Sequence, residues 1–172
     1  MQIVVFAGGV GSRLWPVSRK NTPKQFEKLI GDQSTLQESI ERLLPEFPPT
    51  DIYIATGKKY YDTIKEQLPL IPKENFILEP EMRDVGPAIG LVSAILSKMF
   101  PDEAIAILWS DHLVQNGFEF RKVLRLAEEK VTSNKANFVY IAQKPRFANQ
   151  EHHELALREK RGDLEHLLYV AL

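Results

Sequence analysis

Short apolar runs alternate along the chain with longer segments in which apolar residues recur at helical spacing. Pro45, Pro69 and Pro80 end three of these segments, and Pro87 stands at a helix start, where its missing N–H costs nothing. The pattern predicts strands at residues 3–6, 51–55, 75–79, 103–109 and 137–142, and helices at residues 35–44, 59–68, 86–99 and 118–131. Strand–helix alternation repeated four times predicts a three-layer α/β fold, in which a mostly parallel sheet carries helices on both faces.

Composition places the chain among ordinary globular proteins. Its 172 residues suit one domain or a large part of one, and 44% of them are hydrophobic and 26% charged. The absence of cysteine excludes a disulfide scaffold, a thiolate metal site and cysteine catalysis. The net charge of −1 provides no basic field for nucleic acid. No apolar run is long enough to span a membrane, and the first residues lack a secretory signal, so the default expectation is a cytoplasmic location.

A glycine-rich turn follows the first predicted strand. It contains Gly8, Gly9 and Gly11, and then Ser12 and Arg13. Glycines let backbone N–H groups approach a phosphate closely, and an arginine adds a fork of donors. Five basic residues against one acid in residues 1–30 also favour an anionic ligand. The turn is neither a Walker A loop nor a dinucleotide fingerprint, so a tight strand-to-helix turn with a solvated basic face is the alternative.

Three further segments carry polar groups at predicted strand ends or near the turn. Glu79 ends the third strand, where it can accept hydrogen bonds from a base or sugar, and Gly86 leaves room for a flat base. Asp111 follows the fourth strand and suits a hard cation such as Mg²⁺. Pro23 stiffens the chain before Lys24, whose ammonium can lie over a phosphate. Each segment alone also fits an ordinary loop. Because ligands of parallel sheets bind beyond the carboxyl ends of the strands, together the segments predict one crevice.

Taken together and in this order, the segments resemble the nucleotidyltransferase family that makes nucleotide sugars, and within it the branch of mannose-1-phosphate guanylyltransferases (GDP-mannose pyrophosphorylases). The similar segments are the signature loop at residues 6–19, the lysine motif at residues 23–26, the nucleotide loop at residues 78–89 and the metal motif at residues 110–112. Trp15 and the Gln25-Phe26 pair are typical of mannose-specific members. The sequence departs from the family at Asp84, where many members have asparagine, at Val85-Gly86, where many have Thr-Ala, and at Trp109, where proline is common.

The resemblance implies a Rossmann-like fold and a reaction. The phosphate of mannose 1-phosphate attacks the α-phosphorus of GTP, which gives GDP-mannose and pyrophosphate. Such chemistry depends mainly on positioning and charge stabilisation. The resemblance implies that the triphosphate lies on Gly8, Gly9, Gly11 and Ser12. It also implies that Arg13 neutralises the leaving pyrophosphate and that Lys24 contacts both reacting phosphates. Asp111 would hold Mg²⁺, and Glu79 and Gly86 would lie near the nucleoside. The identity of base and sugar rests on the resemblance alone.

The resemblance ends near residue 148 and divides the chain into two predicted parts. Residues 1–149 are expected to form the nucleotide-binding half of a truncated nucleotide-diphospho-sugar transferase domain. Residues 150–172 are an atypical charged tail whose composition favours a helix. Three explanations of the tail stay open: a segment translated out of frame, the docking helix of a short homologue, or one part of a split enzyme that a second chain completes.

Two expectations follow from the absence of the family's sugar-binding half. This chain alone is not expected to be active, and a non-catalytic nucleotide-binding or regulatory fragment is the alternative function, beside transfer to another sugar 1-phosphate. An incomplete sheet also exposes an edge and an apolar face, which predicts self-association or pairing with a completing chain.

Overall fold

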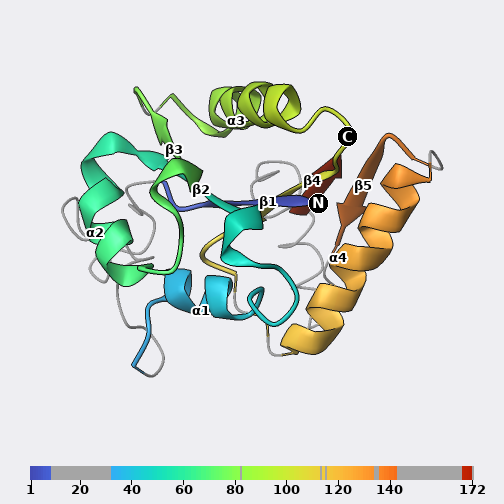
Figure 1. Ribbon diagram of the computed structural model, residues 1–172, viewed down its shortest axis with the longest axis horizontal. Coiled ribbons are helices and arrows are strands. Elements are labelled where there is room, and N and C mark those ends of the chain that lie inside the picture. The colour runs from blue at the N-terminus through green and yellow to red at the C-terminus, as the bar shows by residue number, and fades with distance from the viewer. Residues whose placement is uncertain are drawn as a thin grey trace, which may run out of the picture.

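The computed structural model describes residues 1–8, 32–81, 83–112, 114, 116–133 and 136–142, and the backbone of residues 168–171. Its strands are β1 (Gln2–Phe6), β2 (Ile52–Gly57), β3 (Phe76–Glu79), β4 (Ile105–Trp109), β5 (Phe138–Ile141) and β6 (Leu168–Ala171), and its helices are α1 (Thr35–Glu41), α2 (Tyr61–Gln67), α3 (Val85–Met99) and α4 (Gly117–Thr132) (Figure 1). None of the helices within these ranges is both long and apolar enough to cross a membrane.

The strands form one sheet in the order β3-β2-β1-β4-β6-β5. β1 lies between β2 and β4 and pairs with both in parallel, and β3 extends the parallel part beyond β2. β6 runs antiparallel to β4 on one side and to β5 on the other. The predicted α/β fold with a mostly parallel sheet is therefore confirmed, and the antiparallel strand is an addition that the alternation of elements did not indicate.

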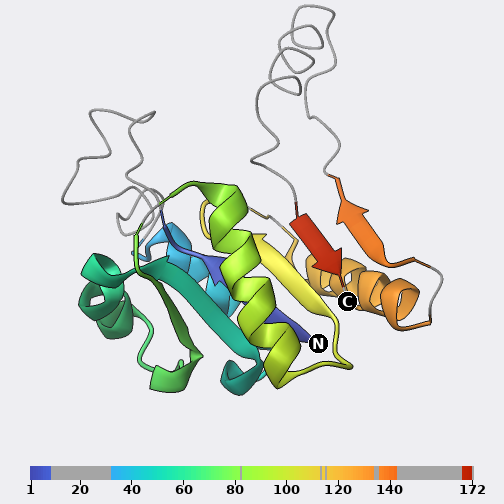
Figure 2. The same cartoon turned by 90° about the horizontal axis from the view of Figure 1, so that it is seen from above.

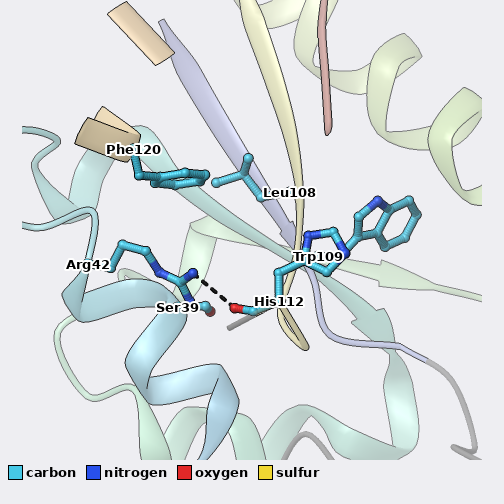
Figure 3. A pocket seen from close by; sticks show the side chains of 6 residues that line it. All are labelled: Ser39, Arg42, Leu108, Trp109, His112 and Phe120. Atoms are coloured by element: carbon cyan, nitrogen blue, oxygen red, sulfur yellow. Dashed lines mark hydrogen bonds between the residues drawn. The ribbon is translucent and has the colours of Figure 1, made fainter. Parts of the chain in front are cut away.

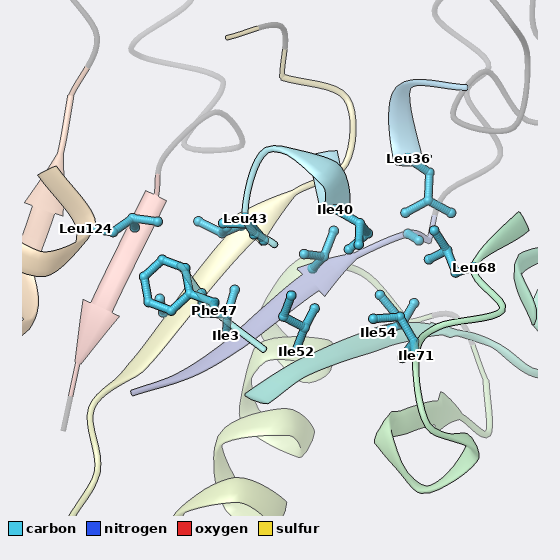
Figure 4. Packing of buried hydrophobic residues seen from close by; sticks show 14 of the residues in the cluster. Ile3, Leu36, Ile40, Leu43, Phe47, Ile52, Ile54, Leu68, Ile71 and Leu124 are labelled. Atoms are coloured by element: carbon cyan, nitrogen blue, oxygen red, sulfur yellow. The ribbon is translucent and has the colours of Figure 1, made fainter. Parts of the chain in front are cut away.

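Helices cover both faces of the sheet (Figure 2). α3 covers one face, where its buried residues pack with Val4 and Phe6 of β1. α1, α2 and α4 contribute to the larger cluster on the opposite face, which includes Ile3 and Val5 (Figure 4). Successive residues of a strand point to opposite faces, so a strand covered on both sides needs a continuous apolar run. Residues 3–6 supply that run, which is why the first strand was evident in the sequence.

The first helix is shorter than the sequence predicts. Ser34 begins α1 with a capping box: its hydroxyl accepts from the Gln37 N–H at 3.2 Å, and the Gln37 side chain accepts from the Ser34 N–H at 3.0 Å. α1 ends at Glu41 rather than at residue 44, and Pro45 follows within one turn. Arg42 thereby becomes the C-cap residue of α1.

The described end of the tail differs from the prediction. Leu168–Ala171 forms β6, whereas the composition of residues 150–172 favoured a helix. The Leu-Tyr-Val-Ala sequence contains the aromatic and β-branched types that favour strands, and the charged residues that suggested a helix come earlier. Residues 143–167 lie outside the described part of the chain. β5 forms an edge, and its Phe138 and Tyr140 side chains are 47% and 41% exposed. Self-association through this edge stays a prediction.

A buried amide joins the start of β2 to the turn before β3. The Asn75 side chain is 4% exposed, and its Nδ2 donates to the carbonyls of Thr50 at 2.8 Å and Ile52 at 3.0 Å. The carbonyl of Pro49 lies at 3.3 Å from the same nitrogen. This one buried amide therefore supplies a donor to three carbonyls at the point where the chain enters β2.

We expect Asn75→Asp to lower the free energy of unfolding by about 2–4 kcal/mol, because it replaces a buried donor by an acceptor that faces backbone carbonyls. Asn116→Asp is the matched control. The Asn116 Oδ1 accepts from the Glu119 N–H at 3.1 Å and begins α4, a role that an aspartate also fills. Urea unfolding of both variants measures the difference. Equal losses of stability would contradict the donor role of Asn75.

Candidate functional site

The carboxyl ends of β1, β2 and β3 bring Gly8 close to Glu79. The Ala7 N–H continues the β1–β2 ladder by donating to the Ala55 carbonyl at 2.9 Å. The buried Thr56 hydroxyl then donates to the Ala7 carbonyl at 2.9 Å. Gly8 follows, and a β-carbon placed on it would lie 3.6 Å from the Glu79 Oε1. The Glu79 carboxyl therefore lies against the start of the glycine-rich turn.

Burial changes the protonation of Glu79. The residue is 9% exposed, and loss of hydration disfavours its charged form. This desolvation raises the pKa of Glu79 above its ordinary value of 4.5. A carboxyl oxygen at this strand end can accept a hydrogen bond from an N–H or O–H group that arrives at this edge.

The loop from β3 into α3 contains a strained residue. Asp84 has φ 96° and ψ 169°, a region that is essentially restricted to glycine and costs on the order of 1–3 kcal/mol for other residues. Its carboxylate accepts from the Val85 N–H at 2.8 Å at the start of α3. Gly86 is exposed, and no atom lies within 4 Å of a β-carbon placed on it. Open space therefore lies beside the first turn of α3. That Gly86 leaves room for a base stays a prediction.

β4 carries Asp111 to the same edge of the sheet, beside β1. The Ser110 N–H donates to the Phe6 carbonyl at 3.2 Å and extends the β1–β4 ladder by one residue. The Trp109 ring packs against the Phe6 ring with their centroids 5.0 Å apart, so this tryptophan adds packing at the strand end. Asp111 follows and is partly exposed. Its carboxylate is an oxygen donor of the kind that Mg²⁺ prefers.

Arg42 contacts the loop immediately after Asp111. The Arg42 Nη1 donates to the His112 carbonyl at 2.9 Å (Figure 3). Burial lowers the pKa of Arg42 below its ordinary value, against the opposing influence of the Glu38 carboxylate. A small pocket surrounds this hydrogen bond. It is lined by Ser39, Arg42, Leu108, Trp109, His112 and Phe120.

The structure describes four of the predicted site residues and brings two of them into proximity. Gly8 lies near Glu79, Asp111 shares their edge because β4 neighbours β1, and Gly86 lies in the first turn of α3. The roles of all the predicted site residues stay predictions. Outside the described residues lie Gly9, Gly11, Ser12, Arg13 and Lys24.

Two residues of this edge were not found from the sequence. Thr56 looks like an ordinary strand residue, and nothing in its spacing indicates that its hydroxyl holds the chain before Gly8. Arg42 looks like a solvated residue at a helix end. The sequence signal for Arg42 is Pro45, which marks the end of a helix nearby. In the structure α1 ends at Glu41, so Arg42 lies just beyond the helix.

Residues 2–148 match the sequence family described as nucleotidyl transferase. The chain belongs to this family. The nucleotidyltransferase chain is 38% identical over 130 residues to a mannose-1-phosphate guanylyltransferase of Escherichia coli. The aligned residues cover 73% of this chain and 27% of that protein. It is 36% identical over 126 residues to the alginate biosynthesis protein AlgA of Pseudomonas putida. This alignment covers 72% of this chain and 26% of that protein. It thus spans about a quarter of the length of these curated relatives.

A solved structure has a fold similar to that of this nucleotidyltransferase chain. The crystal structure of a mannose-1-phosphate geranyltransferase from Thermus thermophilus matches with a TM-score of 0.69 at 26% identity. The match covers 99% of this chain and 54% of that one. The family membership inferred from four short motifs is therefore confirmed.

The raised pKa of Glu79 predicts a pH-dependent effect of Glu79→Gln. The folded state binds this proton more tightly than the unfolded chain does, so the contribution is stabilising below about pH 4 and is lost as pH rises through the folded-state pKa. The free energy of unfolding of the wild type should therefore fall, relative to Glu79→Gln, as the pH of urea titrations rises above the ordinary glutamate pKa and through the raised pKa of folded Glu79. Glu81→Gln, at an exposed position, is the control. Identical pH profiles for the two variants would contradict the role of burial at Glu79.

The backbone strain at Asp84 predicts opposite rankings for two small substitutions. Asp84→Gly and Asp84→Ala both remove the carboxylate that accepts from the Val85 N–H, but only glycine adopts φ 96° without strain. We expect the glycine variant to be more stable than the alanine variant by about 1–2 kcal/mol, after allowing for the greater freedom of glycine in the unfolded chain. Chemical denaturation measures both variants. An alanine variant as stable as the glycine variant would disprove the strain.

Proposed function

We propose that this chain is the nucleotide-binding part of an enzyme that transfers GMP from GTP to mannose 1-phosphate. The observation that carries the proposal is the proximity of Gly8 and Glu79 at the sheet edge to which β4 also brings Asp111. Membership of the nucleotidyl transferase family supports the reaction class. The names of relatives from Escherichia coli and Salmonella typhimurium support mannose 1-phosphate as the acceptor and a guanylyl group as the group transferred.

The reaction exchanges one bond at phosphorus for another. An oxygen of the sugar phosphate bonds to the α-phosphorus of GTP, and the bond from that phosphorus to the pyrophosphate oxygen breaks. The protein's task is to align the reactants and stabilise charge. In this proposal Glu79 accepts hydrogen bonds from the nucleoside and Gly86 gives space to the base. The other proposed roles are those of Gly8, Gly9, Gly11 and Ser12 along the triphosphate, of Arg13 at the leaving pyrophosphate, and of Lys24 at the two reacting phosphates.

The residues at the end of β4 fit a magnesium ion. Mg²⁺ is usually held by one or two carboxylates together with the phosphates of its substrate. Asp111 supplies one carboxylate that is partly exposed at the relevant edge. Among the described residues, no group of three or more His, Asp or Glu side chains offers a complete cage for a metal. When bound, the ion would offset the negative charge of the phosphates. A cytoplasmic location, where GTP is available, belongs to the same proposal.

A second candidate function is nucleotide binding without transfer, in a regulatory or partner role. It is motivated by coverage, because the aligned part corresponds to 27% of the Escherichia coli relative and 54% of the Thermus thermophilus chain. A nucleotidyltransferase that uses another sugar 1-phosphate is a variant of the main proposal. The same assay separates the three.

The proposal predicts that GTP with Mg²⁺ raises the melting temperature of this chain. It also predicts that a form extended to the length of its relatives releases pyrophosphate when mannose 1-phosphate is added. In that form Lys24→Ala should lower turnover by about 10²–10³-fold, the scale of one lost charge-stabilising donor. Lys20→Ala, the same change in the same basic segment, is the matched control and should retain turnover.

The outcomes distinguish the candidate functions. GTP stabilisation with no pyrophosphate release from the extended form would favour the non-catalytic role. Release with another sugar 1-phosphate, but not with mannose 1-phosphate, would change the substrate. The proposal would be refuted if GTP does not stabilise this chain and the extended form shows no turnover. Normal turnover in Lys24→Ala would remove Lys24 from the mechanism.

A further inference from the structure

Arg42 links the end of α1 to the loop that carries Asp111, and the residue that it bonds lies 70 positions further along the chain. The bond runs from the Arg42 Nη1 to the His112 carbonyl at 2.9 Å, and Figure 3 shows the guanidinium turned toward that oxygen. Because the donor carries a charge, such a bond is stronger than one between neutral groups. His112 directly follows Asp111, so the bond acts on the backbone next to the proposed metal ligand.

The guanidinium is itself held in place by α4. It lies over the Phe120 ring, 5.5 Å from the ring centroid. The backbone carbonyl of Arg42 accepts from the Arg121 Nη1 at 2.7 Å. A β-carbon on Gly117 would lie 3.1 Å from the same Arg121 nitrogen and 3.9 Å from the Arg42 Cγ, so a glycine at this position gives both arginines room. Arg42 is therefore fixed at its backbone and at its side chain.

Asp111 lies between two anchored neighbours. On its amino side, the Ser110 N–H donates to the Phe6 carbonyl at 3.2 Å. On its carboxyl side, the His112 carbonyl accepts from Arg42. When both neighbouring residues are fixed, the direction in which the Asp111 side chain leaves the backbone is restricted. Removal of the Arg42 donor takes away the bond that the His112 carbonyl accepts and leaves the Ser110 bond in place.

We propose that Arg42 is a positioning residue for Asp111, acting through the His112 carbonyl rather than by contact with a substrate. The geometric part stands on the described contacts, and its consequence for Mg²⁺-dependent turnover rests on the proposed function. A positioned ligand matters because a catalytic or metal-binding group must be held to within a fraction of an ångström.

The first test measures the loop itself, without nucleotide or metal. Arg42→Met keeps a long unbranched side chain and removes the donors. It should speed hydrogen exchange at the backbone amides of Ser110, Asp111 and His112 by roughly tenfold or more, as expected for the loss of a charge-assisted bond. Arg42→Lys, which retains a donor, should restore part of the protection. Arg125→Met is the matched control, because Arg125 lies over the Phe47 ring at 4.3 Å and pairs with Glu46 at the same helix junction.

The second test connects the loop to Mg²⁺ in the extended form of the protein. Arg42→Met should raise the Mg²⁺ concentration needed for half-maximal pyrophosphate release by roughly tenfold, and Arg125→Met should leave it unchanged. Exchange at Ser110–His112 that stays within about twofold of wild type would overturn the proposal. An equal rise in exchange across β1 and β2 would assign Arg42 a general structural role and overturn it too. If the wild type shows no turnover, the proposed function fails, and the exchange measurement still decides whether Arg42 fixes the loop.

Discussion

The fold and the candidate site both depend on the burial of β1. All five residues from Gln2 to Phe6 are buried, two parallel ladders fix the strand on both sides, and its side chains divide between the two core layers. A strand so constrained cannot slide without moving its apolar residues to the wrong face. Its carboxyl end is therefore a fixed point, and the chain must leave the sheet there at Ala7 and Gly8.

At this edge, the backbone beside Gly8 and Asp111 is held by hydrogen bonds from other parts of the chain. Thr56 holds the carbonyl before Gly8, the Ser110 N–H bonds to β1 beside Asp111, and Arg42 holds the carbonyl that follows Asp111. This arrangement keeps the Asp111 side chain partly exposed while its backbone is fixed. Glu79 is different, because burial itself, rather than a neighbouring charge, alters its ionisation.

The sequence predicted most of the parallel half of the sheet and the shared edge of the site. The apolar run at residues 3–6 and the run that becomes β4 indicate strands because both faces are buried, and residues at the ends of parallel strands must meet at one edge. It did not predict the conformation of Asp84, because a positive φ at aspartate follows from the surrounding loop rather than from the residue type. It also missed Arg42, whose partner is a backbone carbonyl in a distant loop and leaves no trace in periodicity. The strand at 168–171 was hidden by the charged composition of the residues before it.

The antiparallel strand has a consequence for the order of folding during synthesis. β6 pairs Ala171 with Ile105 of β4 and with Phe138 of β5, and in the described part of the chain β5 has no other strand neighbour. Contacts this far apart in sequence form slowly, because a long loop must close before they are gained. The β3-β2-β1-β4 part can assemble while the chain is still growing from its amino end. β5 can join the sheet only after residues 168–171 have been made, so the nascent chain carries an unfinished sheet edge until that segment leaves the ribosome.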